Sequence, residues 1–132
     1  MARKEGNLVK LYVDDLRICP EGWTLARTNT EAIRLLATGY VEEISIDHDI
    51  CAPFSGDISE PVRRRLQIGQ ETFQPVVYYI IAMSPELRPK IINMHTANVG
   101  AGQMLVKLMA QHGIQATYQE GSYIIDLGEN EL

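Results

Sequence analysis

Cysteine is scarce in this chain of 132 residues, which has only Cys19 and Cys51. Neither belongs to a CxxC pair, which argues against a disulfide framework and a zinc–thiolate centre, and we expect free thiols in a cytoplasmic protein. Long apolar runs are missing as well, and residues 1–7 lack the apolar core of a signal peptide. We therefore expect no membrane span and no secretion.

Positive charge is also in short supply, with 12 Lys and Arg against 17 Asp and Glu, a net charge of −5. This balance argues against non-specific adhesion to nucleic acids or membranes. The apolar fraction of 45% is ordinary for a folded protein. No internal repeat or low-complexity tract interrupts the chain, and we expect one domain over residues 1–132.

Apolar periodicity divides the chain into alternating strands and helices. The predicted strands are 8–13, 23–27, 43–47 and 91–94, with a final strand or hairpin in 114–118 and 122–127. Helices are predicted after the capping box of Thr28 and Glu31, from Phe73 to Ile81, and from Asn98 to Gly113. Residues 50–71, with the arginines at 63–65, have no clear period and predict a long loop.

The segment between the first two strands, residues 16–22, is too short for a full crossover helix. Elsewhere, strands alternate with helices. The pattern predicts an α/β protein, a single three-layer domain with a mostly parallel sheet of flavodoxin-like strand order. In this fold the first crossover helix is missing or shortened.

Acidic side chains follow two of the predicted strands. Asp14 and Asp15 end the first, and Asp47 and Asp49 end the central one. Parallel strands bring their carboxyl ends to one edge of the sheet, where several carboxylates repel one another unless a cation neutralises them. Hard oxygen ligands of this number suit Mg²⁺. The alternative is that one or two of these aspartates cap the next turn.

Two histidines lie beside these carboxylates in the predicted layout. His95 ends the strand 91–94, and an imidazole there can exchange a proton with an oxygen leaving group. His48 alternates with Asp47 and Asp49, so it either joins the site or packs under the sheet as a structural histidine. Asp49 is a candidate for orienting a histidine or a water.

Anion-binding groups are predicted at the same edge. Thr96, Asn98 and Gly100 lead into a helix, whose exposed amides attract phosphate, although glycine-rich helix starts are common without a ligand. Arg17 either contacts a phosphate through its guanidinium or balances the aspartates.

In this order, the motifs resemble the cyclic-phosphate processing receiver-like domains, a family derived from response-regulator receiver domains. The resemblance rests on Asp14-Asp15-Leu16-Arg17 with Pro20-Glu21-Gly22-Trp23, on Glu42-Glu43-Ile44-Ser45-Ile46-Asp47-His48-Asp49, and on His95-Thr96-Ala97-Asn98-Val99-Gly100-Ala101-Gly102-Gln103-Met104. It covers the chain from the first strand to the last predicted helix.

The resemblance implies a receiver fold with a Mg²⁺ pocket, in which Asp14 and Asp15 match the metal-binding pair. Asp47 matches the position that receivers phosphorylate, and Thr96 matches their switch hydroxyl. Receivers also keep a lysine after the fifth strand, and none occurs between Ile114 and Leu132. This departure argues against stable phosphorylation.

The leading hypothesis is a metal-dependent phosphoesterase, a hydrolase for cyclic or terminal phosphates of nucleotides or RNA ends. Asp14, Asp15 and Asp47 would hold Mg²⁺, while Arg17 and the amides from Asn98 onward would bind phosphate oxygens. His95 with His48 would protonate the leaving oxygen. The alternatives are a non-catalytic phosphoacceptor module and a cyclic-nucleotide sensor.

Overall fold

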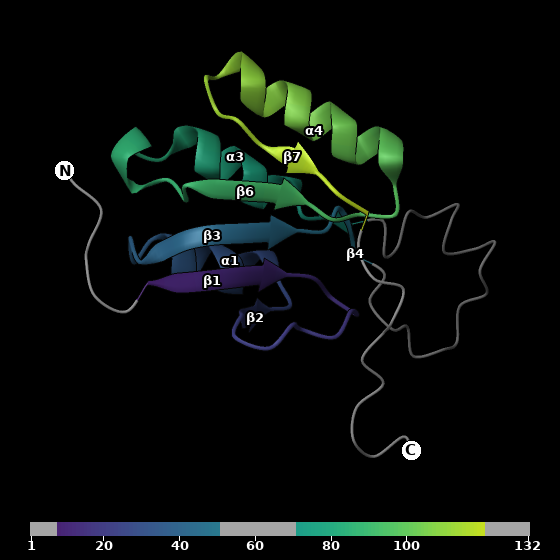
Figure 1. The fold of residues 1–132 in the computed structure, drawn as a ribbon, viewed down its shortest axis with the longest axis horizontal. Helices are drawn as coiled ribbons and strands as arrows, with labels where there is room; N and C mark the ends of the chain where they lie inside the picture. The colour runs from purple at the N-terminus through teal and green to yellow at the C-terminus, as the bar shows by residue number, and fades with distance from the viewer. Residues whose placement is uncertain (1–7, 51–70, 121–132) are drawn as a thin grey trace.

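The computed structural model describes residues 8–50 and 71–120 (Figure 1). Its main feature is a five-stranded sheet with the order β2-β1-β3-β6-β7, in which every neighbouring pair is parallel. The strands are β1 (Val9–Val13), β2 (Thr24–Ala26), β3 (Val41–Ile46), β6 (Ile91–Met94) and β7 (Thr117–Tyr118). This is the receiver or flavodoxin-like order, and the predicted fold class is confirmed.

Three α-helices cover one face of this sheet: α1 (Asn29–Leu36), α3 (Gln74–Ala82) and α4 (Val99–Gln111). They connect β2 to β3, β3 to β6 and β6 to β7, and all these connections step across the sheet in one direction. Right-handed crossovers with the same direction place their helices on the same face. In Figure 1, α1 accordingly lies behind β1 and β3, and α3 lies behind β6.

The connection from β1 to β2 steps the other way and contains no helix. The prediction of a missing first crossover helix is therefore confirmed. As a consequence, the described residues form two layers, the sheet and one layer of helices. The third layer of the predicted three-layer domain is not found among them, because the β1–β2 connection that would supply it contains no helix.

The hydrophobic core lies between the sheet and the helices. Alternate residues of the three central strands point into it, and they meet apolar side chains from each helix. The buried core residues of these strands and helices are Leu11, Val13, Ile44, Ile46, Ile92, Met94, Ala32, Leu36, Val76, Val77, Ile80, Leu105 and Met109. Removing this apolar area from water is the main driving force for the fold.

Local signals in the sequence correspond to the observed boundaries. Thr28 and Glu31 form the predicted capping box, with Glu31 N–H donating to Thr28 Oγ1 over 3.1 Å. Pro75 lies in the first turn of α3, where its missing N–H costs no hydrogen bond. Gly39 and Gly113 follow α1 and α4 with φ of 79° and 78°, the left-handed conformation expected after a helix.

Some boundaries differ from the sequence prediction. β3 runs from Val41 to Ile46, so Asp47 lies just beyond the strand. The ends of the expected 50–71 loop form a two-residue antiparallel ladder between β4 (Asp49–Ile50) and β5 (Glu71–Thr72), and a short 3₁₀ helix spans Pro85–Leu87. The arginines at 63–65 and the hairpin predicted at 122–127 lie outside the described residues.

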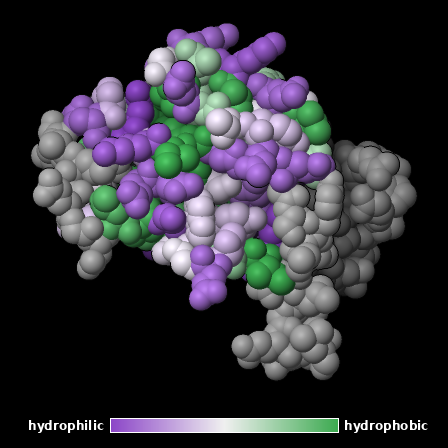
Figure 2. Space-filling model, in the orientation of Figure 1, coloured by the Kyte–Doolittle hydropathy of each residue, from purple (hydrophilic) through white to green (hydrophobic). Residues whose placement is uncertain are grey.

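The opposite face of the sheet carries polar side chains. One residue from each of four strands lies in register, and we call this set the polar row: Tyr12, Ser45, Asn93 and Thr117. Figure 2 looks at the molecule from this side and shows hydrophobic residues in separate patches among hydrophilic ones. In residues 8–50 and 71–120, no helix combines the length and the hydropathy that a membrane span requires.

Gly102 in α4 provides a test of the packing between this helix and β7. A Cβ added there would lie 2.6 and 2.7 Å from ring carbons of Tyr118, whose hydroxyl donates to Thr96 C=O over 2.8 Å. We expect Gly102→Ala to lower the free energy of unfolding by about 1–3 kcal/mol, because the ring is held in place.

Gly100→Ala is the matched control, since nothing lies closer than 4.0 Å to its added Cβ. There, alanine should leave stability unchanged or raise it by up to ~1 kcal/mol through helix propensity. Urea unfolding of both variants measures the difference, and a Gly102→Ala protein as stable as wild type would contradict the packing.

Candidate functional site

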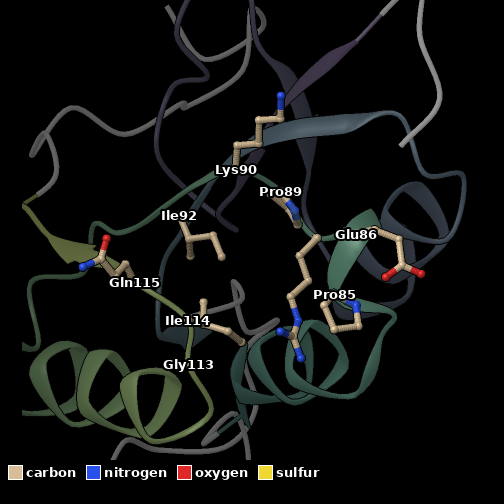
Figure 3. Close-up of a pocket in the computed structure, with 9 residues that line it drawn as sticks. Pro85, Glu86, Pro89, Lys90, Ile92, Gly113, Ile114 and Gln115 are labelled. Atoms are coloured by element: carbon tan, nitrogen blue, oxygen red, sulfur yellow. The ribbon is translucent and has the colours of Figure 1, made fainter. Parts of the chain in front are cut away.

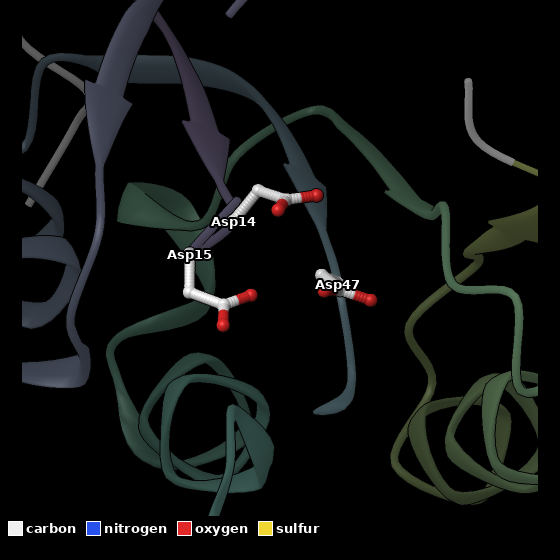
Figure 4. Close-up of side chains that lie close together, drawn as sticks. All are labelled: Asp14, Asp15 and Asp47. Carbon is white, nitrogen blue, oxygen red and sulfur yellow. The ribbon is translucent and has the colours of Figure 1, made fainter. Parts of the chain in front are cut away.

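The predicted site residues from three strands converge at the carboxyl edge of the sheet. Asp14 and Asp15 follow β1, Asp47 follows β3 and His95 follows β6. Each of the three aspartates offers an oxygen atom within 4.8 Å of the others, which we call the acidic cluster (Figure 4). His95 Nε2 lies 2.8 Å from Asp14 Oδ2. The sequence prediction that distant segments meet around one pocket agrees with this geometry.

Asp14 is fully buried and accepts four hydrogen bonds. Its Oδ1 accepts from the N–H groups of Leu16 (2.9 Å) and Arg17 (2.8 Å), and its Oδ2 accepts from the Arg17 guanidinium (2.9 Å) and contacts His95. Burial opposes the charge of Asp14, but the hydrogen bonds from His95, Arg17 and Leu16 outweigh it. They hold the pKa of Asp14 well below its usual range.

Arg17 is the cation of the pocket. Its Nη1 lies 2.9 Å from Asp14 Oδ2 and 3.4 Å from Asp47 Oδ2, so the guanidinium bridges the two strand ends. Burial lowers the pKa of Arg17, but Asp14 and Asp47 raise it overall. Of the two roles predicted from the sequence, the structure contains the contacts of the second, in which Arg17 balances the aspartates.

Asp47 has a different electrostatic environment from Asp14. Burial, and next the charge of Asp14, raise the pKa of Asp47 to about 6, against the hydrogen bond that His48 N–H donates over 2.8 Å. Of the two facing carboxylates, one is therefore strongly ionised and the other titrates near neutral pH. A divalent cation would favour the ionised form of Asp47. The donor set, three hard carboxylates with Asp15 half-buried, fits such an ion.

His95 is buried, and both of its ring nitrogens have partners. Nε2 contacts Asp14, and Nδ1 lies 2.7 Å from Ser45 Oγ. The imidazole also stacks on Tyr12, with ring centroids 4.4 Å apart and an angle of 3° between the planes. Sequence reasoning did not identify Ser45 or Tyr12 as neighbours of the site. The one signal available was a polar residue, Ser45, inside an otherwise apolar strand segment.

A second cluster surrounds His48. Its Nδ1 lies 2.6 Å from Asp49 Oδ1, and its Nε2 lies 3.1 Å from the side-chain nitrogen of Gln74. Asn98 Nδ2 is 3.5 Å from Asp49 Oδ2, which brings the start of α4 to the same place. His48 is buried, while 46% of the Asp49 side chain is exposed. Gln74 was not predicted, because it follows a segment without any clear period.

The predicted phosphate-binding residues surround the first turn of α4. Thr96 Oγ1 accepts from Asn98 N–H over 3.0 Å, and Asn98 Oδ1 accepts from Ala101 N–H over 3.1 Å. Both side chains therefore satisfy backbone donors at the helix start. Gly100 lies in the same turn and is exposed. Phosphate binding by these residues stays a prediction.

A pocket of about 470 Å³ lies elsewhere, at the amino ends of β6 and β7 (Figure 3). Its lining includes Lys90 and Ile114 and contains none of the predicted site residues. Arg88, which also lines it, donates to the carbonyls of Ile80 and Ile81 at the end of α3. Arg88 therefore serves as a helix cap, and the acidic cluster lies at the opposite edge of the sheet.

Comparison with protein families supports the same identification. The family model of the cyclic-phosphate processing receiver domain matches residues 9–111, from the start of β1 to the end of α4. The chain belongs to this family. No curated protein and no solved structure matches it. Every site residue predicted from the sequence lies inside the part that matches the cyclic-phosphate processing receiver domain.

The raised pKa of Asp47 predicts how stability depends on pH. Between the ordinary value of 3.8 and about 6, the folded protein binds a proton that the unfolded chain has lost. The free energy of unfolding should therefore fall as pH rises through this window, and the contribution of Asp47 should level off above it. Asp14 acts in the opposite sense, with stability lost as pH falls below its ordinary range.

Asp47→Asn removes this contribution and should raise the free energy of unfolding near neutral pH by on the order of 1–3 kcal/mol. Urea unfolding at a series of pH values, in the presence of a metal chelator, measures the effect. Parallel pH profiles for wild type and variant would show that Asp47 is not the responsible group.

Proposed function

We propose that this protein is a metal-dependent phosphoesterase that acts on cyclic or terminal phosphates of nucleotides or RNA ends. The observation that carries the proposal is the meeting of the acidic cluster, Arg17 and His95 at one edge of the sheet in a cyclic-phosphate processing receiver domain. Carboxylates that bind a cation, a guanidinium and imidazoles are the groups that phosphoryl chemistry needs.

In this proposal Asp14, Asp15 and Asp47 hold Mg²⁺. The ion contributes a charge that polarises a phosphoryl oxygen and lowers the pKa of a bound water. The pKa of Asp14 is held low by its four donors, so its carboxylate is ionised, whereas the pKa of Asp47 is raised to about 6, so below this pH a cation would compete with a proton for Asp47. Metal affinity should therefore increase as pH rises through about 6.

Arg17 and the first turn of α4 are the proposed phosphate-binding groups. The guanidinium already bridges Asp14 and Asp47, so it lies where a phosphate oxygen bound to the same cation would approach. Amides near Gly100, with Thr96 and Asn98 beside them, add the positive end of the helix dipole.

His48, His95 and Asp49 are the proposed catalytic residues. Asp49 orients the His48 ring through Nδ1, which leaves Nε2 facing only the neutral amide of Gln74. His95 Nε2, by contrast, faces the ionised carboxylate of Asp14. A neutral partner exchanges for a substrate oxygen at lower cost, so Nε2 of His48 is better prepared to take a proton from the attacking water and then give it to the leaving oxygen, and His95 also orients Asp14.

A phosphoacceptor module is the second candidate. Its support is the position of Asp47 at the carboxyl end of β3, where receivers are phosphorylated, with buried Thr96 just after β6. The ion pair between Arg17 and Asp47 would have to open before Asp47 could accept a phosphoryl group.

Hydrolysis of 2′,3′-cyclic nucleotides tests the first candidate. We expect turnover with Mg²⁺, none with a chelator, and a loss of about 10²–10⁴-fold in kcat for His48→Ala or His95→Ala. The matched control is His112→Ala, because His112 is an exposed histidine beyond the end of α4. Absence of turnover across several cyclic nucleotides, or equal activity of all three variants, would count against the enzyme.

Intact-mass analysis after exposure to acetyl phosphate and Mg²⁺ tests the second candidate. The phosphoesterase proposal expects no lasting adduct. A stable gain of one phosphoryl group that is lost in Asp47→Asn would favour the phosphoacceptor module instead. If neither turnover nor adduct is found, calorimetry with a cyclic nucleotide distinguishes a sensor, which binds the ligand without consuming it.

A further inference from the structure

The polar row contains a buried polar residue: Ser45 lies in the central strand of the sheet and is only 7% exposed. A buried hydroxyl needs hydrogen-bond partners, and an apolar residue would fill the position at no such cost. Ser45 lies between Tyr12 on β1 and Asn93 on β6 in the strand register. Its hydroxyl also contacts the ring of His95, which makes it a link between the polar row and the acidic cluster.

A continuous chain of hydrogen bonds runs across four strands toward Asp14. Thr117 Oγ1 lies 2.8 Å from Asn93 Oδ1, and Asn93 Nδ2 lies 3.3 Å from Ser45 Oγ. Ser45 Oγ is 2.7 Å from His95 Nδ1, and His95 Nε2 is 2.8 Å from Asp14 Oδ2. Every contact is between side chains. Asn93 lies within β6 and His95 just beyond its end, and the other residues come from β7, β3 and the end of β1.

Asp14 sets the direction of this chain. Its carboxylate accepts from two backbone amides and from the Arg17 guanidinium, so it is ionised and can only accept. His95 Nε2 must therefore carry a proton and donate it to Asp14. In a neutral imidazole the other nitrogen, Nδ1, then has a lone pair and needs a donor.

Ser45 is the donor that Nδ1 requires. When its O–H points to His95, its oxygen is free to accept from the Asn93 amide. The Asn93 carbonyl oxygen then faces Thr117, whose hydroxyl donates to it. Asn93, Ser45 and His95 each have one donor role and one acceptor role in the same direction. The Thr117 hydroxyl lies closer to the Asn93 oxygen (2.8 Å) than to the Ile92 carbonyl (3.4 Å).

We propose that Ser45, Asn93 and Thr117 are positioning residues that hold His95 as its Nε2–H tautomer and aim that N–H at Asp14. Stacking on Tyr12 fixes the plane of the ring but leaves open which nitrogen carries the proton. The Asp14 carboxylate selects the proton at Nε2, and the chain supplies the donor that Nδ1 then needs. Through His95 it also holds Asp14 Oδ2 in place, the oxygen that Arg17 shares.

The assignment of the Nε2–H tautomer to His95 does not depend on the phosphoesterase proposal. The effect of this tautomer on catalysis does rest on that proposal. If the acidic cluster holds a cation, then loss of an orienting partner behind a ligand should weaken metal binding or activity by about 10–100-fold. The two claims therefore need separate measurements.

Long-range ¹H–¹⁵N spectra of the histidine side chains test the tautomer directly. At about pH 8, above the ordinary histidine pKa, we expect His95 to show an unprotonated Nδ1 and a protonated Nε2, assigned by the loss of its signals in His95→Gln. Asn93→Asp should reverse the chain, because the introduced carboxylate cannot donate to Ser45. The Ser45 hydroxyl then turns to that carboxylate, and Nδ1, left without a donor, should change its resonance while Nε2 keeps its proton.

Variants at Thr117 and Ser45 distinguish a positioning role from a role in packing alone. Thr117→Val removes the first donor at an exposed position, while Thr117→Ser keeps the hydroxyl and should restore the wild-type spectrum. Ser45→Ala should shift the Nδ1 resonance toward that of an imidazole without a donor, and Mg²⁺ calorimetry should show the 10–100-fold weaker binding expected for a lost outer partner. Thermal unfolding confirms that each variant is folded.

A protonated Nδ1 in the wild type, or an unchanged His95 spectrum in Asn93→Asp, would overturn the inference. Failure of the phosphoesterase proposal has a different signature: the spectra behave as expected, but wild type neither binds Mg²⁺ nor hydrolyses cyclic nucleotides. A third outcome, in which Ser45→Ala changes the spectrum but not the metal affinity, would remove the link from the tautomer to the acidic cluster.

Discussion

The buried carboxylate of Asp14 is the interaction on which the rest of this site depends. An isolated charge without contact to water is costly, and it persists only when the surrounding groups replace its hydration. Here the β1–β2 connection contributes two amides and a guanidinium, and β6 contributes an imidazole. The Asp14 carboxylate thus connects the ends of β1 and β6. Replacing one of its donors would change the hydrogen bonds that the other donors make to it.

The same charge explains why two similar residues behave differently. Asp47 is buried next to an anion that is already stabilised, and it receives fewer donors, so its proton is retained to a higher pH. An acidic pocket built from equivalent carboxylates would repel itself at neutral pH. Unequal hydrogen bonding limits this repulsion, because Asp14 keeps its charge to low pH while Asp47, even with Arg17 beside it, loses its proton only near pH 6.

Sequence reasoning located the strand ends because each one joins an apolar run to a charged residue, a local pattern that needs no knowledge of register. It also anticipated the missing crossover helix, from the short distance between β1 and β2. The hydrogen-bonded residues across the sheet could not be predicted from the sequence. Ser45, Asn93 and Thr117 meet only through strand pairing, and no local pattern marks them as neighbours of His95. Gln74 was missed for a related reason, because the segment before α3 lacks periodicity.

The helix-free connection between β1 and β2 has a consequence for the motion of the protein. Asp15 and Arg17 lie on a segment held by polar contacts, including the bond from Arg27 Nη1 to Arg17 C=O, while the core beneath belongs to other elements. Segments with few apolar contacts open at a low free-energy cost, independently of global unfolding. We therefore expect the β1–β2 connection to open locally while the sheet stays folded. Such an opening would move the Arg17 guanidinium away from Asp47 and admit a ligand.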